Sequence, residues 1–166
     1  MHEIATATKS YPRFADGRID YTNERVCYVL NCVVVSGTDV LLTKRSADVI
    51  AYPNTINGVS GFIDDTSKTL EEIATTELTE ELEAPIEKLK RLKVAKPFIQ
   101  IDDEIHREWH VYTVLAEFEA TFVPQTNWEN KSATWFAIRD VPDMTLMRGF
   151  LETFQTAMKL REEVGR

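Results

Sequence analysis

The sequence predicts an α/β fold in which helices pack against a mixed β-sheet. Several runs rich in β-branched and aromatic residues have the length of strands and are bounded by turn residues. Two other stretches carry apolar residues at the spacing of a helix. Hydrophobic residues make up 43% of the 166-residue chain, which argues against disorder and is sufficient for one core.

The first 24 residues form a polar segment whose turn signals include Asp16-Gly17. We expect residues 1–24 to be an N-terminal arm or an edge hairpin. Beyond them, the sequence contains no linker-like stretch, internal repeat or low-complexity tract. Residues 25–166 are therefore expected to form a single domain.

The two strands of a hairpin are expected over residues 26–35 and 40–44. The first run is rich in Val, and the Ser36-Gly37-Thr38-Asp39 stretch between the runs has the composition of a turn. Residues 48–61 contain Asn57-Gly58, which favours a loop. We expect this region to hold one short strand at most.

A helix is expected to begin at Thr69, because Thr69 and Glu72 have the spacing of a capping box. The residues that follow are apolar at roughly helical spacing, namely Leu70, Ile73, Ala74, Leu78 and Leu82. Pro85 cannot continue a helix and is expected to end it.

The second half of the chain is expected to contain three strands and a helix. Residues 92–101 and 109–118 have strand character and are joined by an acidic turn. A third strand is expected over residues 133–138. Apolar residues between Met147 and Leu160 recur at helical spacing, which predicts an amphipathic C-terminal helix.

The sequence has the features of a cytoplasmic protein. Its apolar runs are shorter than the ~20 residues that span a bilayer, and its N-terminus lacks the layout of a secretory signal. Cys27 and Cys32 are five positions apart in a strand-like run, so they are expected to face opposite sides. Two such cysteines are best explained as free, buried thiols in a reducing compartment.

The negative charge is concentrated in one segment. The formal net charge is −8, and residues 64–87 hold nine acidic residues and one basic residue, which accounts for all of it. The rest of the chain carries equal numbers of acidic and basic residues. This balance disfavours nucleic acid as a partner, because phosphate backbones are bound by basic surfaces.

Three carboxylates of this segment are expected to share one face of the predicted helix. Glu77, Glu80 and Glu81 are three and four positions apart, so their side chains are neighbours. Like charges at this spacing cost about 0.2–0.5 kcal/mol per pair unless a cation lies between them. Carboxylate oxygens are the preferred ligands of hard cations such as Mg²⁺ and Mn²⁺. A solvated acidic face is the simpler alternative on composition alone.

The stretch from Gly61 to Glu81 resembles the signature of the Nudix hydrolases, G-x5-E-x7-R-E-U-x-E-E-x-G-U, where U is aliphatic. Residues 77–81 (Glu-Leu-Thr-Glu-Glu) reproduce the E-U-x-E-E part in full. The order of elements is also similar to that family over roughly residues 25–164. The resemblance implies a Nudix-like mixed β-sheet sandwiched between helices.

The signature is incomplete in this chain. Phe62 stands at its first Gly, Lys68 at its first Glu, Thr76 at its Arg and Glu83 at its last Gly. In the family the first Glu and the Arg are usually interpreted as partners that brace a loop against the helix. Both are replaced here, which avoids leaving one charge unpaired.

The resemblance implies a Mg²⁺- or Mn²⁺-dependent hydrolase that cleaves a pyrophosphate bond in a nucleoside diphosphate-linked or nucleotide substrate. Glu77, Glu80 and Glu81 would hold the metal and take part in catalysis. The incomplete signature leaves open a nucleotide-binding sensor domain that does not hydrolyse its ligand. An isopentenyl diphosphate isomerase is disfavoured, because the sequence around Cys27 and Cys32 does not resemble its metal site. The expected partner is a small nucleotide-type molecule, with neither nucleic acid nor a membrane, and a homodimer stays open.

Further site residues follow from the same resemblance. Glu129 lies six residues before Trp135, a spacing at which some family members carry a catalytic base. The base could instead be a carboxylate of the metal helix or an acidic residue of the turn at 102–104. Arg45 and Gly61 are the expected substrate-binding residues.

Overall fold

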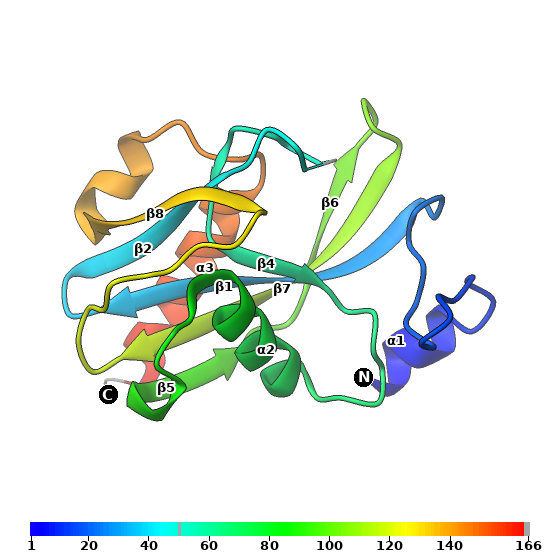
Figure 1. The fold of residues 1–166 in the computed structure, drawn as a ribbon, viewed down its shortest axis with the longest axis horizontal. Helices are drawn as coiled ribbons and strands as arrows, with labels where there is room; N and C mark the ends of the chain where they lie inside the picture. The colour runs from blue at the N-terminus through cyan, green and yellow to red at the C-terminus, as the bar shows by residue number, and fades with distance from the viewer. Residues whose placement is uncertain (50, 165–166) are drawn as a thin grey trace.

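The computed structural model describes residues 1–49 and 51–164. Within these ranges the strands form one eight-stranded sheet (Figure 1). In chain order the elements are α1 (His2–Ala7), β1 (Val26–Ser36), β2 (Asp39–Arg45), β3 (Ile56–Asn57), β4 (Val59–Phe62), α2 (Leu70–Leu82), η1 (Ile86–Lys88), β5 (Leu89–Val94), β6 (Phe98–Asp102), β7 (Arg107–Phe118), β8 (Asn130–Ala137), η2 (Ile138–Asp143) and α3 (Phe150–Val164).

The sheet is mixed because its two long central strands run parallel. Residues 26–35 of β1 lie opposite residues 108–117 of β7, whereas every other strand pair is antiparallel. The main path runs β3-β2-β1-β7-β5, with β4 also paired to β1, β6 to β7 and β8 to β2. β1 therefore joins the two halves of the sheet.

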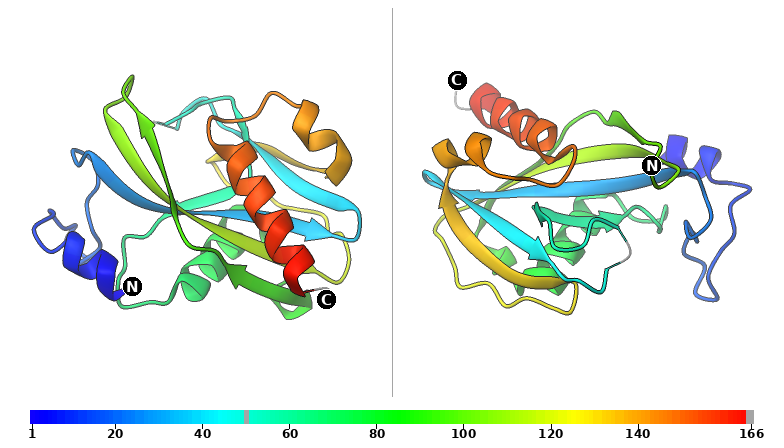
Figure 2. Two further views of the ribbon diagram at one scale, coloured as in Figure 1. Left: turned by 180° about the vertical axis from the view of Figure 1, so that it is seen from behind. Right: turned by 90° about the horizontal axis from the view of Figure 1, so that it is seen from above.

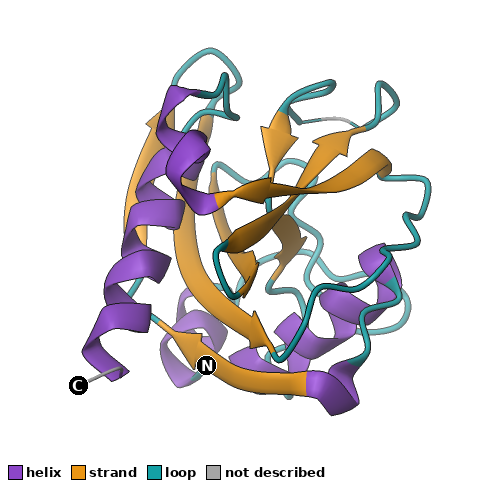
Figure 3. Cartoon of the chain, turned by 90° about the vertical axis from the view of Figure 1, so that its left-hand side faces the viewer, coloured by secondary structure: helices purple, strands orange, loops and turns teal. Residues whose placement is uncertain are grey.

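A hydrophobic core lies on each face of the sheet. Alternate residues of β1 enter different cores: Cys32 packs in the cluster that contains Leu78 of α2, and Val33 packs in the cluster that contains Phe154 of α3. α2 and α3 lie on opposite faces, as two further views show (Figures 2 and 3). The predicted fold class, a mixed sheet between helices, is confirmed.

The predicted hairpin forms, and the loop after it contains two short strands where one was expected. β3 pairs with β2, and β4 pairs with β1. The change of partner falls at Gly58, where a Cβ atom would lie 2.2 Å from the carbonyl oxygen of Cys32. Only glycine permits this close approach of two backbones.

The strand expected over residues 92–101 is two strands, β5 and β6. β5 pairs with the C-terminal half of β7 and β6 with its N-terminal half. Residues 95–97 separate them, and Pro97 in this break has no N–H to donate to a neighbouring strand. Strand propensity alone did not reveal the interruption.

The two long helices differ from expectation mainly at their ends. The capping box of Thr69 and Glu72 is present. α2 ends at Leu82, before Pro85, because Glu83 adopts a left-handed conformation with φ 48° and caps the helix. α3 begins at Phe150, later than predicted, after Gly149 with φ +82°.

Residues 1–24 contain the short helix α1 and an isolated antiparallel bridge between Arg13 and Ile19. Ile4 and Tyr21 are buried in the core on the α2 face, so this segment is packed against the domain. Cys27 and Cys32 are buried and free. Among residues 1–49 and 51–164, no helix combines the length and apolar character that crossing a membrane requires.

Candidate active site

A cleft of about 540 Å³ opens between α2, the central strands and the N-terminal segment. Five residues predicted from the sequence line it, and these are Arg45, Gly61, Glu77, Glu80 and Glu129. The sixth, Glu81, is 2% exposed and lies in the protein interior. The predicted residues therefore come from four different elements or their ends, yet they gather in one region.

α2 places its acidic residues at different depths. Leu78 and Leu82 point into the core, which turns the neighbouring Glu77 and Glu81 toward the sheet and leaves Glu80 exposed. Gly61 on β4 makes room for Glu77, because a Cβ atom at Gly61 would lie 2.1 Å from Glu77 Oε1. Even the smallest side chain at position 61 would displace this carboxylate.

The Glu81 carboxylate is held by two hydrogen bonds from other elements. The backbone N–H of Ser60 donates to Oε1 at 3.2 Å, and Asn130 Nδ2 donates to Oε2. Burial, with a smaller contribution from the nearby charge of Glu129, raises the pKa of Glu81 to about 8, although the bond from Asn130 opposes the shift. β4 and β8 therefore fix the orientation of Glu81.

The other carboxylates of the cleft are also destabilised as anions. Burial raises the pKa of Glu77 to about 8, and the charges of Glu81 and Glu129 contribute. Burial likewise raises the pKa of Glu129, which directly precedes β8. Among the described residues, Glu77, Glu81 and Glu129 form no ion pair within 4 Å.

Arg45 is a cation whose charge interacts with those of Glu81 and Glu129. Its Nε donates to the carbonyl oxygen of Ala51 at 3.1 Å, which anchors the guanidinium at the end of β2. Burial lowers the pKa of Arg45, and the negative charges of Glu81 and Glu129 oppose that shift. If all of these carboxylates were ionised, one guanidinium would leave an excess of negative charge.

The donor set of the cleft suits a hard divalent cation. As they stand, no three acidic, histidine or cysteine side chains within residues 1–49 and 51–164 converge closely enough to hold a metal ion. The residues nevertheless offer carboxylate oxygens, the ligands that Mg²⁺ and Mn²⁺ prefer. They also lack an internal counter-ion of sufficient charge, which a divalent cation would supply.

The acidic turn at residues 102–104, the alternative position for the catalytic base, has a different environment from that of Glu129. Asp102 is buried, accepts a hydrogen bond from the Tyr52 hydroxyl at 2.7 Å and lies 3.4 Å from Arg148. Trp109 Nε1 donates to the same Tyr52 hydroxyl at 3.1 Å. Asp102 therefore holds an aromatic wall of the cleft in place, and Glu104 is exposed outside it.

Sequence reasoning did not identify three residues that support the site. Asn130 and Ser60 bind Glu81, and Arg18 of the N-terminal segment lines the cleft. Asn130 directly follows the predicted Glu129, so a search of its neighbours could have found it. The positions of Ser60 and Arg18 depend on tertiary contacts that have no local signal.

A model of the NUDIX domain family matches residues 28–154. The match covers more than half of the chain, and the chain belongs to the Nudix family. The family and the fold indicate, at the level of class, a hydrolase of nucleotide-type pyrophosphates. No curated protein matches the sequence.

Solved structures share the fold at low sequence identity. The Nudix hydrolase RenU from M. smegmatis has a TM-score of 0.63 at 20% identity, covering 92% of this chain and 92% of that one. The NUDIX domain of Shewanella oneidensis NrtR, solved with ADP ribose, has a TM-score of 0.68 at 16% identity and covers 99% of each. A MutT Nudix hydrolase from Burkholderia pseudomallei has a TM-score of 0.63 at 20% identity, covering 80% and 98%.

Proposed function

We propose that this chain is a Mg²⁺- or Mn²⁺-dependent hydrolase that cleaves a pyrophosphate bond in a nucleoside diphosphate-linked or nucleotide substrate. The observation that carries the proposal is the group of cleft carboxylates around Glu77 and Glu81 that lacks matching cations. A buried charge without a partner is costly, and a bound cation would remove that cost. The two free, buried thiols fit the expected cytoplasmic location.

Glu77, Glu80 and Glu81 are the residues that would hold the metal. When bound there, the ion supplies positive charge and Lewis acidity beside the diphosphate. Gly61 keeps the space that the Glu77 side chain occupies, and Asn130 orients Glu81. The chain thus contributes donors whose positions are set by β4 and β8 as well as by α2.

Glu129 is the proposed general base. Glu129, the residue before β8, lines the same cleft as Glu77, and its carboxylate can accept a proton from an attacking water molecule. The burial that raises its pKa also makes it a stronger base than a solvated glutamate. Arg45 would bind a phosphate oxygen, which reduces the charge that repels the nucleophile.

Hydrolysis of capped diphosphates would test the proposal directly. Both phosphates of a compound such as ADP ribose are esterified, so a coupled phosphatase releases phosphate only after the pyrophosphate bond is cleaved. We expect phosphate release from at least one member of a panel of nucleoside diphosphate derivatives with Mg²⁺ or Mn²⁺. Glu77→Gln should abolish the release, and Glu87→Gln, outside the cleft on η1, is the matched control.

A nucleotide-binding sensor without hydrolysis is the second candidate. It is supported by the incomplete signature at Phe62, Lys68, Thr76 and Glu83, and by the ADP ribose bound to the similar NrtR domain. The same panel distinguishes the two functions. Binding of a compound, measured by calorimetry, without phosphate release in Mg²⁺ or Mn²⁺ would favour the sensor and contradict the hydrolase.

A further inference from the structure

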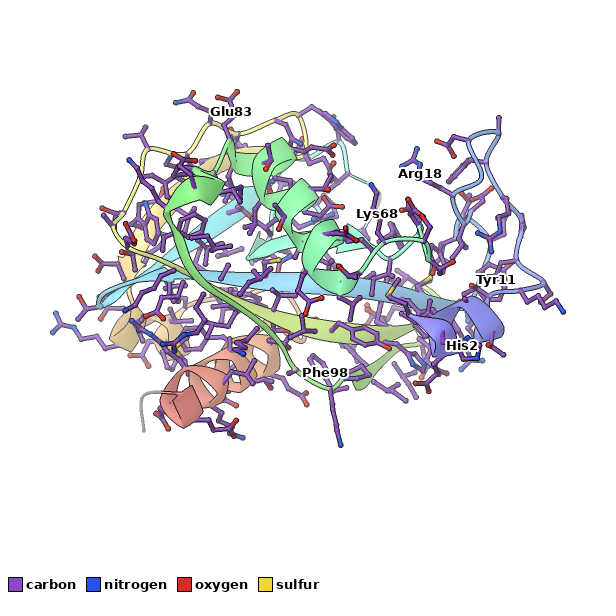
Figure 4. All side chains as sticks on the ribbon, turned by 90° about the horizontal axis from the view of Figure 1, so that it is seen from below. His2, Tyr11, Arg18, Lys68, Glu83 and Phe98 are labelled. Atoms are coloured by element: carbon purple, nitrogen blue, oxygen red, sulfur yellow. The ribbon has the colours of Figure 1, made fainter. Side chains whose placement is uncertain are left out.

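The part of the N-terminal segment formed by residues 18–24 lies outside the family match, which begins at residue 28, yet it borders the cleft through Arg18. It runs beside the loop that leads from β4 to α2, residues 63–69. Figure 4 shows the segment, with Arg18 labelled, next to the loop that carries Lys68. This loop joins the strand that contains Gly61 to the helix that contains Glu77.

The segment contacts the first part of the loop through both backbone and side chains. The Tyr21 hydroxyl donates to the carbonyl oxygen of Ile63 at 2.9 Å in a buried position. The backbone N–H of Ile19 donates to the carbonyl oxygen of Asp64 at 2.8 Å. Two consecutive peptide carbonyls of the loop are thus bound by the segment.

Two side-chain contacts extend this interface. The Tyr21 ring stacks on Phe62, with centroids 5.2 Å apart and planes 16° apart. Arg18 Nη1 lies 3.3 Å from Asp64 Oδ2, and Arg18 Nε lies 2.9 Å from Asp16 Oδ2. Arg18 and Lys68 have carboxylates of Asp16, Asp64 and Asp65 beside them, so this corner carries no excess of positive charge. A role in holding the loop therefore fits the contacts better than anion binding.

The segment is itself fixed to the central sheet. Arg107 at the start of β7 donates to the backbone carbonyls of Tyr21 and Thr22 at 2.8 Å each, and to that of Glu24. Ile19 and Tyr21 are 1% and 4% exposed. An anchored element in contact with a loop restricts the conformations that the loop can adopt.

We propose that residues 18–24 position the metal-binding face of α2, with Tyr21 and Arg18 as the positioning residues. By holding Phe62 and the two residues after it, the segment sets the distance between Gly61 and Glu77. The proposal rests on the proposed function of that helix. It adds to the working site a part of the chain that the family match does not include.

Two pairs of variants test it. Tyr21→Phe removes only the hydrogen bond to the loop, and Tyr11→Phe is its control, because the Tyr11 hydroxyl binds the Val26 carbonyl at 3.2 Å. Arg18→Met removes the ion pairs with Asp64 and Asp16. Arg13→Met is its control, since the Arg13 side chain donates only to the carbonyl of Gly17 among the described residues. The measurements are kcat and KM, amide hydrogen exchange over residues 62–76, and Mn²⁺ affinity.

We expect Tyr21→Phe to lower kcat by roughly three- to tenfold, the effect of about one hydrogen bond, with KM unchanged. Exchange over residues 62–76 should be faster in Tyr21→Phe than in Tyr11→Phe. Arg18→Met should show a smaller effect of the same kind, because its ion pair is exposed. If Tyr21→Phe does not fold, Arg18→Met carries the test.

A purely structural segment would give a different result. Equal losses of melting temperature in Tyr21→Phe and Tyr11→Phe, with kcat and exchange unchanged, would overturn the proposal. If the parent protein hydrolyses no diphosphate, the proposed function fails separately. Mn²⁺ affinity then decides, with weaker binding in Tyr21→Phe than in Tyr11→Phe supporting the positioning role and equal binding refuting it.

Discussion

Two buried carboxylates on opposite faces of the sheet have opposite electrostatic environments. Glu117 of β7 lies on the α3 face, where Arg161 Nη2 and Arg91 Nη1 approach its oxygens at 3.0 and 3.5 Å. Glu81 of α2 lies on the other face, where its partners are a backbone N–H and the Asn130 amide. Glu117 is ion-paired within the chain, whereas Glu81 has no cation within 4 Å among the described residues.

This difference separates a structural carboxylate from a candidate functional one. Glu117 connects β7, β5 and α3 through ion pairs with Arg91 and Arg161. Glu81 and Glu77 carry a cost that folding alone does not remove, because like charges and burial both disfavour their ionised forms. Such a site is maintained where binding of a ligand compensates for the unfavourable burial of these carboxylates.

The largest expected effect is a loss of turnover on substitution of Glu129, which belongs to the site on the α2 face. If Glu129 accepts the proton of the attacking water, Glu129→Gln should lower turnover by ~10²–10⁴-fold, the usual contribution of a general base. Binding should change little, because glutamine keeps the shape of the side chain. Steady-state and single-turnover rates measure this, and Glu104→Gln, which changes an exposed residue outside the cleft, is the control.

Unchanged single-turnover rates in Glu129→Gln would place the base elsewhere. Loss of activity in Glu104→Gln would move it to the acidic turn. If both variants keep full activity, the base lies among the carboxylates of α2.

The next prediction compares Glu117 and Glu81 directly. The measured quantity is the change that each substitution makes in the free energy of unfolding without metal. Glu117→Gln should cost about 3 kcal/mol, because it leaves Arg91 and Arg161 without their anion. Glu81→Gln should cost little, since an amide avoids burying a charge. Asn130 can rotate to offer its Oδ1, which has no hydrogen-bond partner among the described residues, to the new donor.

Urea unfolding at neutral pH with EDTA measures both values. A loss in Glu81→Gln as large as that in Glu117→Gln would contradict the contrast. It would mean that Glu81 is a structural carboxylate as well.

Added metal should stabilise the protein only through the carboxylates on the α2 face of the sheet. Mg²⁺ or Mn²⁺ at 100 times its Kd should raise the free energy of unfolding by ~2.7 kcal/mol through mass action. The increase should vanish in a variant with Glu80→Gln and Glu81→Gln together, and persist in Glu117→Gln. Thermal melts at several metal concentrations provide the measurement, and an equal increase in all three proteins would place the metal elsewhere.

The smallest expected effect is a change in melting temperature at the C-terminal end of α2, on the same face as Glu81. Glu83 has φ 48° and ψ 40°, a conformation that costs non-glycine residues roughly 1 kcal/mol. Glu83→Gly should therefore raise the melting temperature by about 2–4 °C without changing metal affinity. Ala84→Gly, at the next position, is the control and should not stabilise the protein.

Local patterns predicted the parts of the site that depend on one element. The Thr69 capping box and the spacing of Glu77, Glu80 and Glu81 are properties of a single helix, and both follow from the sequence. The strand break at Pro97 and the early end of α2 depend on competition between neighbouring conformations. Propensity rules place such boundaries poorly.

Contacts between distant segments could not be derived in this way. The bond from Asn130 to Glu81 and the bond from Tyr21 to Ile63 each join residues more than forty positions apart. Their partners are chosen by the packing of the whole sheet. The depth of Glu81 has the same origin, because an acidic residue next to Glu80 gives no local sign of burial.

The parallel pairing of β1 with β7 has a consequence for how the chain acquires its structure. Val26 pairs with Glu108 and Val35 with Glu117. The edge of β1 that pairs with β7 therefore stays uncovered until most of the domain has been synthesised. Contacts of such long sequence separation slow folding. Until β7 arrives, the Val-rich β1 exposes an unpaired edge, and we expect nascent or refolding chains to aggregate most readily through this strand.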